Sequence, residues 1–247
     1  PKPMIHIGNK PILWHIMKIY ASQGFKDFVI LLGYKGEMIK DYFLNYNYYN
    51  SNLRINLANE QKEIIDKNPE DWKVTLVDTG ENTMTGGRIK KAKKYIGNDK
   101  FFLTYGDGLS NVNLKNLIKF HESNNSIATM TGVQLQGRFG ALEFDNNKIT
   151  NFKNRNNLLK NFREKSKKDN SWINGGFFIF ENIIFNFIKN DQTTFEQEPL
   201  QKLAKKKRLF VYKHKNFFFF MFNIFYHQFL NTLCATTKPP RHLRLYN

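Results

Sequence analysis

The sequence has few of the residues that build disulfide or zinc sites. Among its 247 residues is one cysteine, Cys234, which excludes a disulfide framework within the chain and any cysteine-rich metal site. Its six histidines include no His-x-x-x-His pair, so the spacing argues against zinc. A single cysteine is compatible with a reducing cytoplasm, which is the location that we expect.

Long apolar runs are also missing. The most apolar stretch, residues 217–230, is interrupted by Asn223, His227 and Gln228. It is shorter than the roughly 20 apolar residues that span a bilayer, so we expect no membrane partner. No secretory signal stands at the start, and the sequence opens at Pro1 without an initiator methionine. We therefore expect a fragment without its true N-terminus.

Glycine is absent from the last part of the sequence. All 15 glycines lie at or before Gly176, whereas average usage would put about five in the remainder. Residues 217–222 are almost all phenylalanine, and the Lys-Pro-Pro-Arg of residues 238–241 fits neither helix nor strand. We expect one domain over residues 1–214 and a divergent, disordered tail over residues 215–247.

Acidic residues are scarce relative to basic ones. Lysine and arginine total 38 against 21 acids, a net charge of +17. Such an excess is typical of proteins that bind nucleic acids or other anions. Here it is spread along the chain, and only residues 165–168 and 205–208 form short basic clusters. We favour a compositional bias, because no nucleic-acid-binding module is recognisable and we expect no nucleic-acid partner.

What is present is an alternation of helical and extended patterns. Apolar residues at helical spacing predict helices in four segments, and short apolar runs predict buried strands between them. The expected helices span residues 10–23, 36–43, 88–95 and 114–123; the expected strands span residues 28–32, 74–77, 101–105, 127–133, 141–144, 149–152 and 177–180. This order favours an α/β fold with a mostly parallel sheet. Residues 154–170 are polar and basic, and we expect an exposed loop there.

The sharpest local feature is Thr-Tyr-Gly-Asp-Gly at residues 104–108, directly after an apolar strand. Ligands of open α/β sheets bind beyond the carboxyl ends of the strands. Glycine on both sides of Asp107 allows close approach of a phosphate, and a lone carboxylate there can hold Mg²⁺. A simple Gly-Asp-Gly turn explains the stretch equally well.

Three further segments are candidates for binding. Thr85, before two glycines and Arg88, could cap a helix whose free N–H groups face an anion or a base. The amide of Asn174, before Gly175 and Gly176, suits recognition of hydroxyls. The carboxylates around Glu196 could bind sugar hydroxyls or open the helix that follows.

The order of these pieces resembles one family. Residues 1–17, the Val-Thr-Leu-Val-Asp-Thr-Gly of residues 74–80, Met-Thr-Gly-Gly-Arg of 84–88, Tyr-Gly-Asp-Gly of 105–108, Gly-Arg-Phe-Gly-Ala-Leu of 137–142, Ile-Asn-Gly-Gly-Phe-Phe of 173–178 and Glu-Gln-Glu-Pro-Leu of 196–200 follow each other as in sugar-1-phosphate nucleotidylyltransferases. Over residues 1–214 the chain looks most like the glucose-1-phosphate cytidylyltransferase branch. The resemblance implies a three-layer α/β/α nucleotidyltransferase (Rossmann-like) fold.

The resemblance also implies an activity and a set of site residues. The family transfers a nucleotide, here CMP from CTP, to a sugar phosphate, here glucose 1-phosphate, and releases pyrophosphate. In such a site Lys2 and Asp107 are catalytic, and Asp107 holds Mg²⁺. The nucleotide is contacted by Lys2, Thr83, Gly87, Arg88 and Gly106. The sugar phosphate is contacted by Lys165, Asn174, Gly175 and Glu196, and a homo-oligomer is implied.

The sequence departs from the family pattern in three places. The family's first strand and Gly-x-Gly-Thr-Arg loop, which precede the counterpart of Lys2, are absent. Ser166 replaces the proline of a Glu-Lys-Pro element, after extra residues, so Lys165 is a weaker assignment. Met221 is followed by Phe222, where the family has Met-Asp-Thr with a second metal-binding aspartate. We therefore expect little transferase activity from this chain.

Three alternatives remain beside a cytidylyltransferase. One is a nucleotidylyltransferase for another base, and the second is an inactive remnant that binds nucleotide or sugar phosphate. The third, a basic nucleic-acid-binding protein, has little support from motifs.

Overall fold

A computed structural model describes residues 1–66, 70–134, 141–144, 159–163, 172–220 and 232–236. The elements in chain order are η1 (Lys2–Met4), β1 (His6–Ile7), β2 (Lys10–Pro11), α1 (Ile12–Ala21), β3 (Asp27–Leu32), α2 (Gly36–Leu44), α3 (Tyr46–Tyr49), β4 (Asn52–Asn56), β5 (Gln61–Asp66), β6 (Lys73–Asp78), α4 (Thr85–Ile96), β7 (Phe101–Tyr105), β8 (Gly108–Ser110), α5 (Leu114–Ser123), β9 (Ala128–Gln134), β10 (Ala141–Phe144), β11 (Leu159–Arg163), β12 (Trp172–Phe180), η2 (Asn182–Phe187), α6 (Pro199–Lys205), β13 (Leu209–Lys213), β14 (Phe218–Phe220) and β15 (Thr232–Thr236).

One large sheet runs through the molecule. Its strands lie in the order β11-β10-β12-β7-β15-β3-β6, and β9 pairs with both β12 and β13. Strands β3, β6, β7, β9, β10 and β13 run in one direction, and β11, β12 and β15 run in the other. The predicted α/β fold is confirmed, but the sheet is mixed. Among the described strands only the pairs β3–β6 and β9–β13 are parallel, because β12 and β15 are antiparallel to all their neighbours and β11 is antiparallel to β10.

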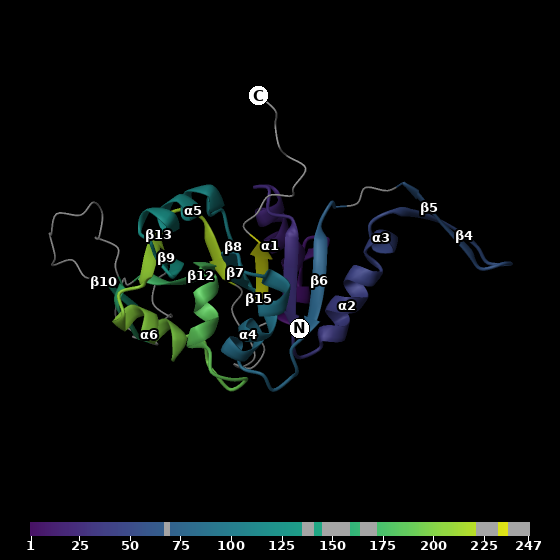
Figure 1. Cartoon of the computed structure of the whole chain (residues 1–247). Helices are drawn as coiled ribbons and strands as arrows, with labels where there is room; N and C mark the ends of the chain where they lie inside the picture. Colours follow the sequence, from purple (N-terminus) through teal and green to yellow (C-terminus); the bar gives the residue numbers. More distant parts are fainter. Residues whose placement is uncertain (67–69, 135–140, 145–158, 164–171, 221–231, 237–247) are drawn as a thin grey trace, which may run out of the picture.

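Helices cover both faces of this sheet. Successive side chains of a strand point to opposite faces. In β3, Val29 and Leu31 pack in one core with α4, η2 and α6, while Phe28, Ile30 and Leu32 pack in a second core with α1, α2 and α5. The helices α1, α2, α4, α5 and α6 are labelled in Figure 1. The result is the expected three-layer α/β/α arrangement.

The predicted helices and strands that carry the core are confirmed. Helix α1 buries one face by apolar residues at helical spacing: Ile12, Leu13, Ile16, Met17 and Tyr20. It ends at Ala21, and the chain then turns through Gly24, whose φ is 96°. Strand β7 and helix α5 have the bounds that their apolar patterns predicted.

Several local predictions differ from the structure, and strand β12 begins at Trp172 rather than at residue 177. Helix α4 begins at Thr85, earlier than predicted. The loop expected over residues 154–170 contains β11, which pairs with β10 through its backbone, a contact that local polarity does not reveal. The hairpin β4–β5 was not anticipated, since its residues are largely exposed and polar, and it projects away from the sheet (Figure 1). The strand expected over residues 149–152 lies outside the described residues.

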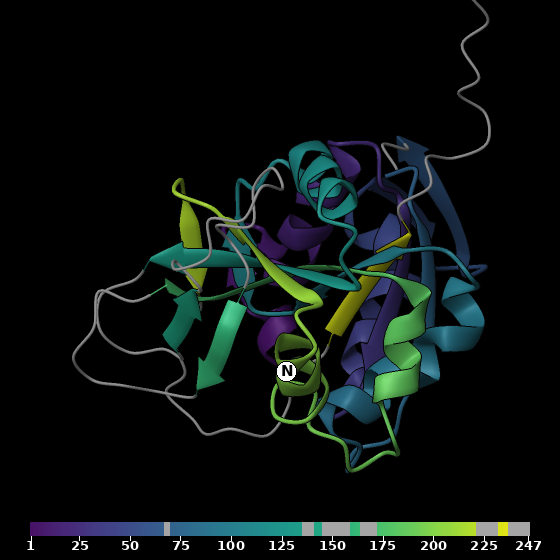
Figure 2. The ribbon, with the colours of Figure 1, turned by 60° about the vertical axis from the view of Figure 1, so that its left-hand side comes forward.

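Two segments beyond residue 214 have strand structure. Strand β14 pairs with β8, and β15 lies within the sheet between β3 and β7 (Figure 2). Leu233, Cys234 and Ala235 of β15 are buried. The boundary expected at residue 214 therefore does not coincide with an edge of the sheet. Within the described ranges, no helix is long and apolar enough to cross a membrane.

Candidate active site

Lys2 and Asp107 meet at one edge of the sheet. Asp107 follows β7, and Lys2 lies in the short turn η1 before the β1–β2 hairpin. The Lys2 Nζ is 3.6 Å from Asp107 Oδ2. Asp107 and Gly106 are both buried in the turn after β7. The fold thus brings together a cation and a carboxylate that are far apart in the sequence.

The carboxylate of Asp107 is unusual for a buried charge. Apart from the ion pair with Lys2, neither of its oxygens has a hydrogen-bond partner among the described residues. Burial raises the pKa of Asp107 to about 6, and the nearby Lys2 opposes this rise. A buried group without partners is costly unless a ligand satisfies it. Asp107 is therefore a candidate ligand-binding group.

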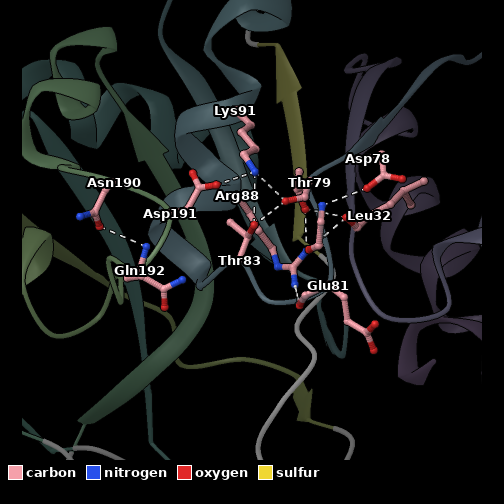
Figure 3. A network of polar contacts seen from close by, with 11 residues as sticks. Leu32, Asp78, Thr79, Glu81, Thr83, Arg88, Lys91, Asn190, Asp191 and Gln192 are labelled. Atoms are coloured by element: carbon pink, nitrogen blue, oxygen red, sulfur yellow. Dashed lines mark hydrogen bonds and ion pairs between the residues drawn. The ribbon is translucent and has the colours of Figure 1, made fainter.

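Arg88 organises the loop after β6. Its guanidinium donates to the carbonyl oxygens of Leu32, Gly80 and Glu81 at 3.1, 2.9 and 2.9 Å. It also donates to Thr79 Oγ1 at 2.5 Å (Figure 3). These contacts direct Arg88 at the protein backbone, so the structure gives it a role in shaping the loop.

Thr83 belongs to the same network. It is buried, and its hydroxyl donates to the Thr79 carbonyl oxygen at 2.5 Å. The Nζ of Lys91 reaches the same carbonyl at 2.8 Å and pairs with the Asp191 carboxylate at 2.7 Å (Figure 3). The structure thus brings Thr83 and Arg88 together around one loop.

The start of α4 differs from the expected anion site. Thr85 does not cap the helix; the N-cap residue is Met84, without a side-chain hydrogen bond. The N–H groups of Met84 and Gly86 donate to the carbonyl oxygens of Asp191 and Thr193, at 2.8 and 2.9 Å. The expectation of free N–H groups here was wrong for these two, because a loop distant in sequence accepts their bonds.

The two glycines of α4 permit that loop to approach. A Cβ on Gly87 would lie 2.5 Å from the Cα of Asp191, and one on Gly86 would lie 2.7 Å from the Thr193 carbonyl oxygen. No other residue fits such a gap without moving the backbone. Gly87 therefore acts in the structure through close packing.

A second group of candidates surrounds Tyr105. Its hydroxyl donates to Glu196 Oε1 at 2.6 Å, and Thr85 Oγ1 donates to Glu196 Oε2 at 2.8 Å. Burial, followed by the charge of Glu196, raises the pKa of Tyr105 well above its usual value, and a hydrogen bond with Asn174 opposes that rise. Tyr105 thus links the two residues expected to recognise hydroxyls.

The contacts of Asn174 and Gly175 are local, and they do not by themselves indicate a ligand. Asn174 Oδ1 accepts from the N–H of Gly176 at 2.9 Å, a bond within its own turn. A Cβ on Gly175 would lie 2.8 Å from Thr131 Oγ1, so its lack of a side chain serves packing. Lys165 and the segment at residues 137–140 lie outside the described residues.

Sequence reasoning missed the role of Tyr105 and misassigned that of Thr85. Tyr105 belongs to the Tyr-Gly-Asp-Gly motif, but the sequence pattern indicated no function for it. The hydrogen bonds of both residues to Glu196 join positions about a hundred residues apart, so no spacing within a motif could reveal them.

Known proteins resemble this chain over most of its length. The family model of the nucleotidyl transferases matches residues 1–232. The glucose-1-phosphate cytidylyltransferase of Salmonella typhimurium is 45% identical over 88% of this chain and 81% of its own length. The probable glucose-1-phosphate cytidylyltransferase of Bacillus subtilis is 44% identical over the same shares.

Solved structures agree with this relationship. HddC from Yersinia pseudotuberculosis complexed with GMP-PN has a TM-score of 0.67 and 26% identity, over 89% of this chain and 84% of that one. A UDP-glucose pyrophosphorylase complexed with UDP-glucose has a TM-score of 0.60 over 88% of this chain and 84% of that one, and at 19% identity it supports the fold alone. The chain therefore belongs to the nucleotidyl transferase family of enzymes, together with the glucose-1-phosphate cytidylyltransferases.

Proposed function

We propose that this chain carries out the transfer of CMP from CTP to α-D-glucose 1-phosphate, giving CDP-glucose and pyrophosphate, at a rate that its departures from the family pattern reduce. The observation that carries the proposal is the meeting of Lys2 with the buried, otherwise partnerless Asp107 at the strand ends. It occurs in a chain 45% identical to a glucose-1-phosphate cytidylyltransferase. A relative with a bound nucleotide analogue, GMP-PN, gives further support.

The reaction is a displacement at phosphorus. A phosphate oxygen of glucose 1-phosphate attacks the α-phosphorus of CTP, and the bond from that phosphorus to the bridging oxygen breaks. The bridging oxygen leaves with pyrophosphate, so atoms and charge balance. Such a transfer depends on positioning and on neutralising charge. Lys2 supplies a fixed positive charge beside the phosphates. A positioned cation of this kind stabilises the negative charge that develops on the phosphates in the transition state.

Asp107 fits the Mg²⁺ that the proposal requires. Hard cations prefer carboxylate oxygens, and both Asp107 oxygens lack hydrogen-bond partners in the described chain. No group of three or more potential metal ligands occurs among the described residues. Mg²⁺ commonly binds one or two carboxylates together with water and substrate phosphates. When bound, the ion would neutralise the charge on those phosphates.

The other candidates divide between two substrates. The loop that Arg88 and Thr83 organise, with Gly87 and Gly106, is proposed to contact the nucleotide. Asn174, Gly175 and Glu196 are proposed to contact the sugar, and Lys165 its phosphate.

The test is base selectivity together with product formation. Calorimetry with Mg²⁺ is expected to give tighter binding of CTP than of UTP. The two bases differ by an amine against a carbonyl, and a buried polar mismatch typically costs about 1–3 kcal/mol. That cost corresponds to a ratio of dissociation constants of about 5- to 150-fold. Equal dissociation constants would contradict the cytidylyl assignment.

A second candidate is a protein that binds these substrates without turnover. The observation that favours it is Met221-Phe222-Asn223, where the resembling family has a metal-binding aspartate. Incubation with CTP and glucose 1-phosphate, followed by chromatography for CDP-glucose, separates the two. Selective CTP binding without any CDP-glucose would favour the second candidate.

The biological setting belongs to the same proposal. It comprises a cytoplasmic enzyme that supplies a sugar nucleotide for polysaccharide or O-antigen synthesis, as a homo-oligomer, without a nucleic-acid or membrane partner.

A further inference from the structure

The carboxylate of Glu196 is held from two sides by residues that the proposed function does not use. Tyr105, at the end of β7, donates to Oε1 at 2.6 Å, and Thr85, at the start of α4, donates to Oε2 at 2.8 Å. Each carboxylate oxygen can accept two hydrogen bonds. One acceptor position on each oxygen therefore remains for a ligand, in an orientation that the two hydroxyls fix.

The direction of both hydrogen bonds is determined by the surroundings. The N–H of Phe195 donates to Thr85 Oγ1 at 2.9 Å, so the single proton of Thr85 is available for Glu196. Tyr105 stays protonated at neutral pH, because burial and the adjacent charge raise its pKa well above the usual value. Both hydroxyls thus act as donors to the carboxylate.

Thr85 also joins Glu196 to the nucleotide side of the site. The same helix start carries Met84 and Gly86, whose N–H groups bond the carbonyl oxygens of Asp191 and Thr193. Residues 191–196 are therefore tied to the start of α4 by backbone bonds and by the Thr85 hydroxyl. Loss of that hydroxyl would leave the backbone bonds of Met84 and Gly86 but free Glu196 Oε2, so that Tyr105 alone would hold the carboxylate.

We infer that Thr85 is a positioning residue for binding of the sugar phosphate. Together with Tyr105, it fixes the orientation of the Glu196 carboxylate, and this carboxylate accepts hydrogen bonds from the sugar hydroxyls. The inference rests on the proposed function, in which Glu196 contacts the sugar. Thr85 itself touches no substrate in this arrangement.

The test compares Thr85→Val, which keeps the side-chain shape, with Thr85→Ser, which keeps the hydroxyl. We expect Thr85→Val to weaken binding of glucose 1-phosphate about fivefold by calorimetry, since one oriented hydrogen bond is worth about 1 kcal/mol. Binding of CTP should change by less than about twofold, and Thr85→Ser should restore the parent affinity. Thr129→Val is the matched control, because it removes a buried hydroxyl that bonds His121 and Ser126 instead. It should leave both affinities unchanged.

Two results would overturn the inference. One is an unchanged affinity for glucose 1-phosphate in Thr85→Val; the other is an equal loss for CTP and glucose 1-phosphate, which marks a merely structural role. A parent chain that binds neither substrate contradicts the proposed function instead. In that case amide exchange at Phe195 decides: faster exchange in Thr85→Val, restored in Thr85→Ser, supports the hold on this segment, and unchanged exchange overturns it.

Discussion

At the scale of single residues, the site contains a charge that costs stability. Asp107 is buried, and its only polar partner in the described chain is the amine of Lys2, 3.6 Å away. A structure that keeps such a group without further partners stores an unfavourable interaction that a ligand can relieve. The same reasoning separates Asp107 from the many exposed carboxylates of the chain.

We expect Asp107→Asn to abolish Mg²⁺-dependent binding of CTP and to stabilise the ligand-free protein. Its pKa of about 6 leaves the buried carboxylate mostly ionised at pH 7, and asparagine removes that charge. The gain in the free energy of unfolding at pH 7 should be about 1–3 kcal/mol. Thermal unfolding with and without CTP and Mg²⁺ measures both effects. The exposed Asp71→Asn is the control, and persistent Mg²⁺-dependent stabilisation by CTP in Asp107→Asn would exclude Asp107 as the ligand.

A second residue, His121, gives the protein a dependence on pH. It is buried, and its Nδ1 lies 2.8 Å from Thr129 Oγ1 while its Nε2 lies 3.1 Å from Glu181 Oε1. Burial lowers the pKa of His121; Glu181 and Glu122 oppose this, and Lys100 adds to it. The unfolded chain therefore binds a proton more readily at this position, below a pH of about 6.5.

From this shift we expect the free energy of unfolding to decrease as the pH is lowered. A histidine with a lowered folded-state pKa contributes stability above its unfolded pKa, and that contribution is lost as the pH falls through the folded value. Urea unfolding between pH 7.5 and 5.5 should show a larger loss for the parent than for His121→Gln. The exposed His6→Gln should follow the parent. Parallel curves for the parent and His121→Gln would contradict the assignment.

At the scale of elements, the start of α4 is shaped by a loop from the other half of the chain. The helix has no side-chain cap, and backbone carbonyls of residues 191 and 193 take the place of one. Unsatisfied N–H groups at a helix start need partners. The close approach that supplies them depends on Gly86 and Gly87.

Gly87→Ala is expected to destabilise the protein by about 1–3 kcal/mol, because its Cβ would overlap backbone atoms of Asp191 at 2.5 and 2.6 Å. It should also weaken CTP binding, since the loop that Arg88 and Thr83 organise, which we propose to contact the nucleotide, leads into this helix start. Gly97→Ala, at the other end of α4, is the comparison. Gly97 has a φ of 75° and open space around it, so alanine there costs about 1–2 kcal/mol through backbone strain alone. Equal effects of the two variants on CTP affinity would show that packing at the start of α4 has no special effect on nucleotide binding.

At the scale of the whole molecule, β15 completes the sheet. It is antiparallel to both β3 and β7 and separates two strands that run in the same direction. Leu233 and Ala235 face one core, and Cys234 faces the other. The described part of the sheet is therefore continuous only when this late segment is in place.

The single cysteine provides a direct test of that placement. Cys234 is fully buried, and burial raises the pKa of its thiol, so reaction with a thiol reagent should require unfolding. We expect native protein to resist Ellman's reagent and protein in guanidinium chloride to react with one equivalent. Rapid reaction under native conditions would show that β15 is not inserted between β3 and β7.

The sequence by itself determined the elements that carry the core and pointed to a candidate site. Apolar periodicity predicted α1, β3, β7 and α5, because burial of one helix face or of both strand faces requires that pattern. Glycines around Asp107, directly after an apolar strand, located the candidate ligand. The order of motifs led to the family.

Only the tertiary structure decided what those residues touch. Lys2 reaches Asp107, Thr85 serves Glu196 instead of capping its helix, and Arg88 bonds the backbone of a loop. The same holds for β11 and β15, whose short or polar sequences acquire strand structure from neighbours in the sheet. Such contacts join residues far apart in the chain, and hydrogen bonding and close packing between distant segments leave no periodic trace in the sequence.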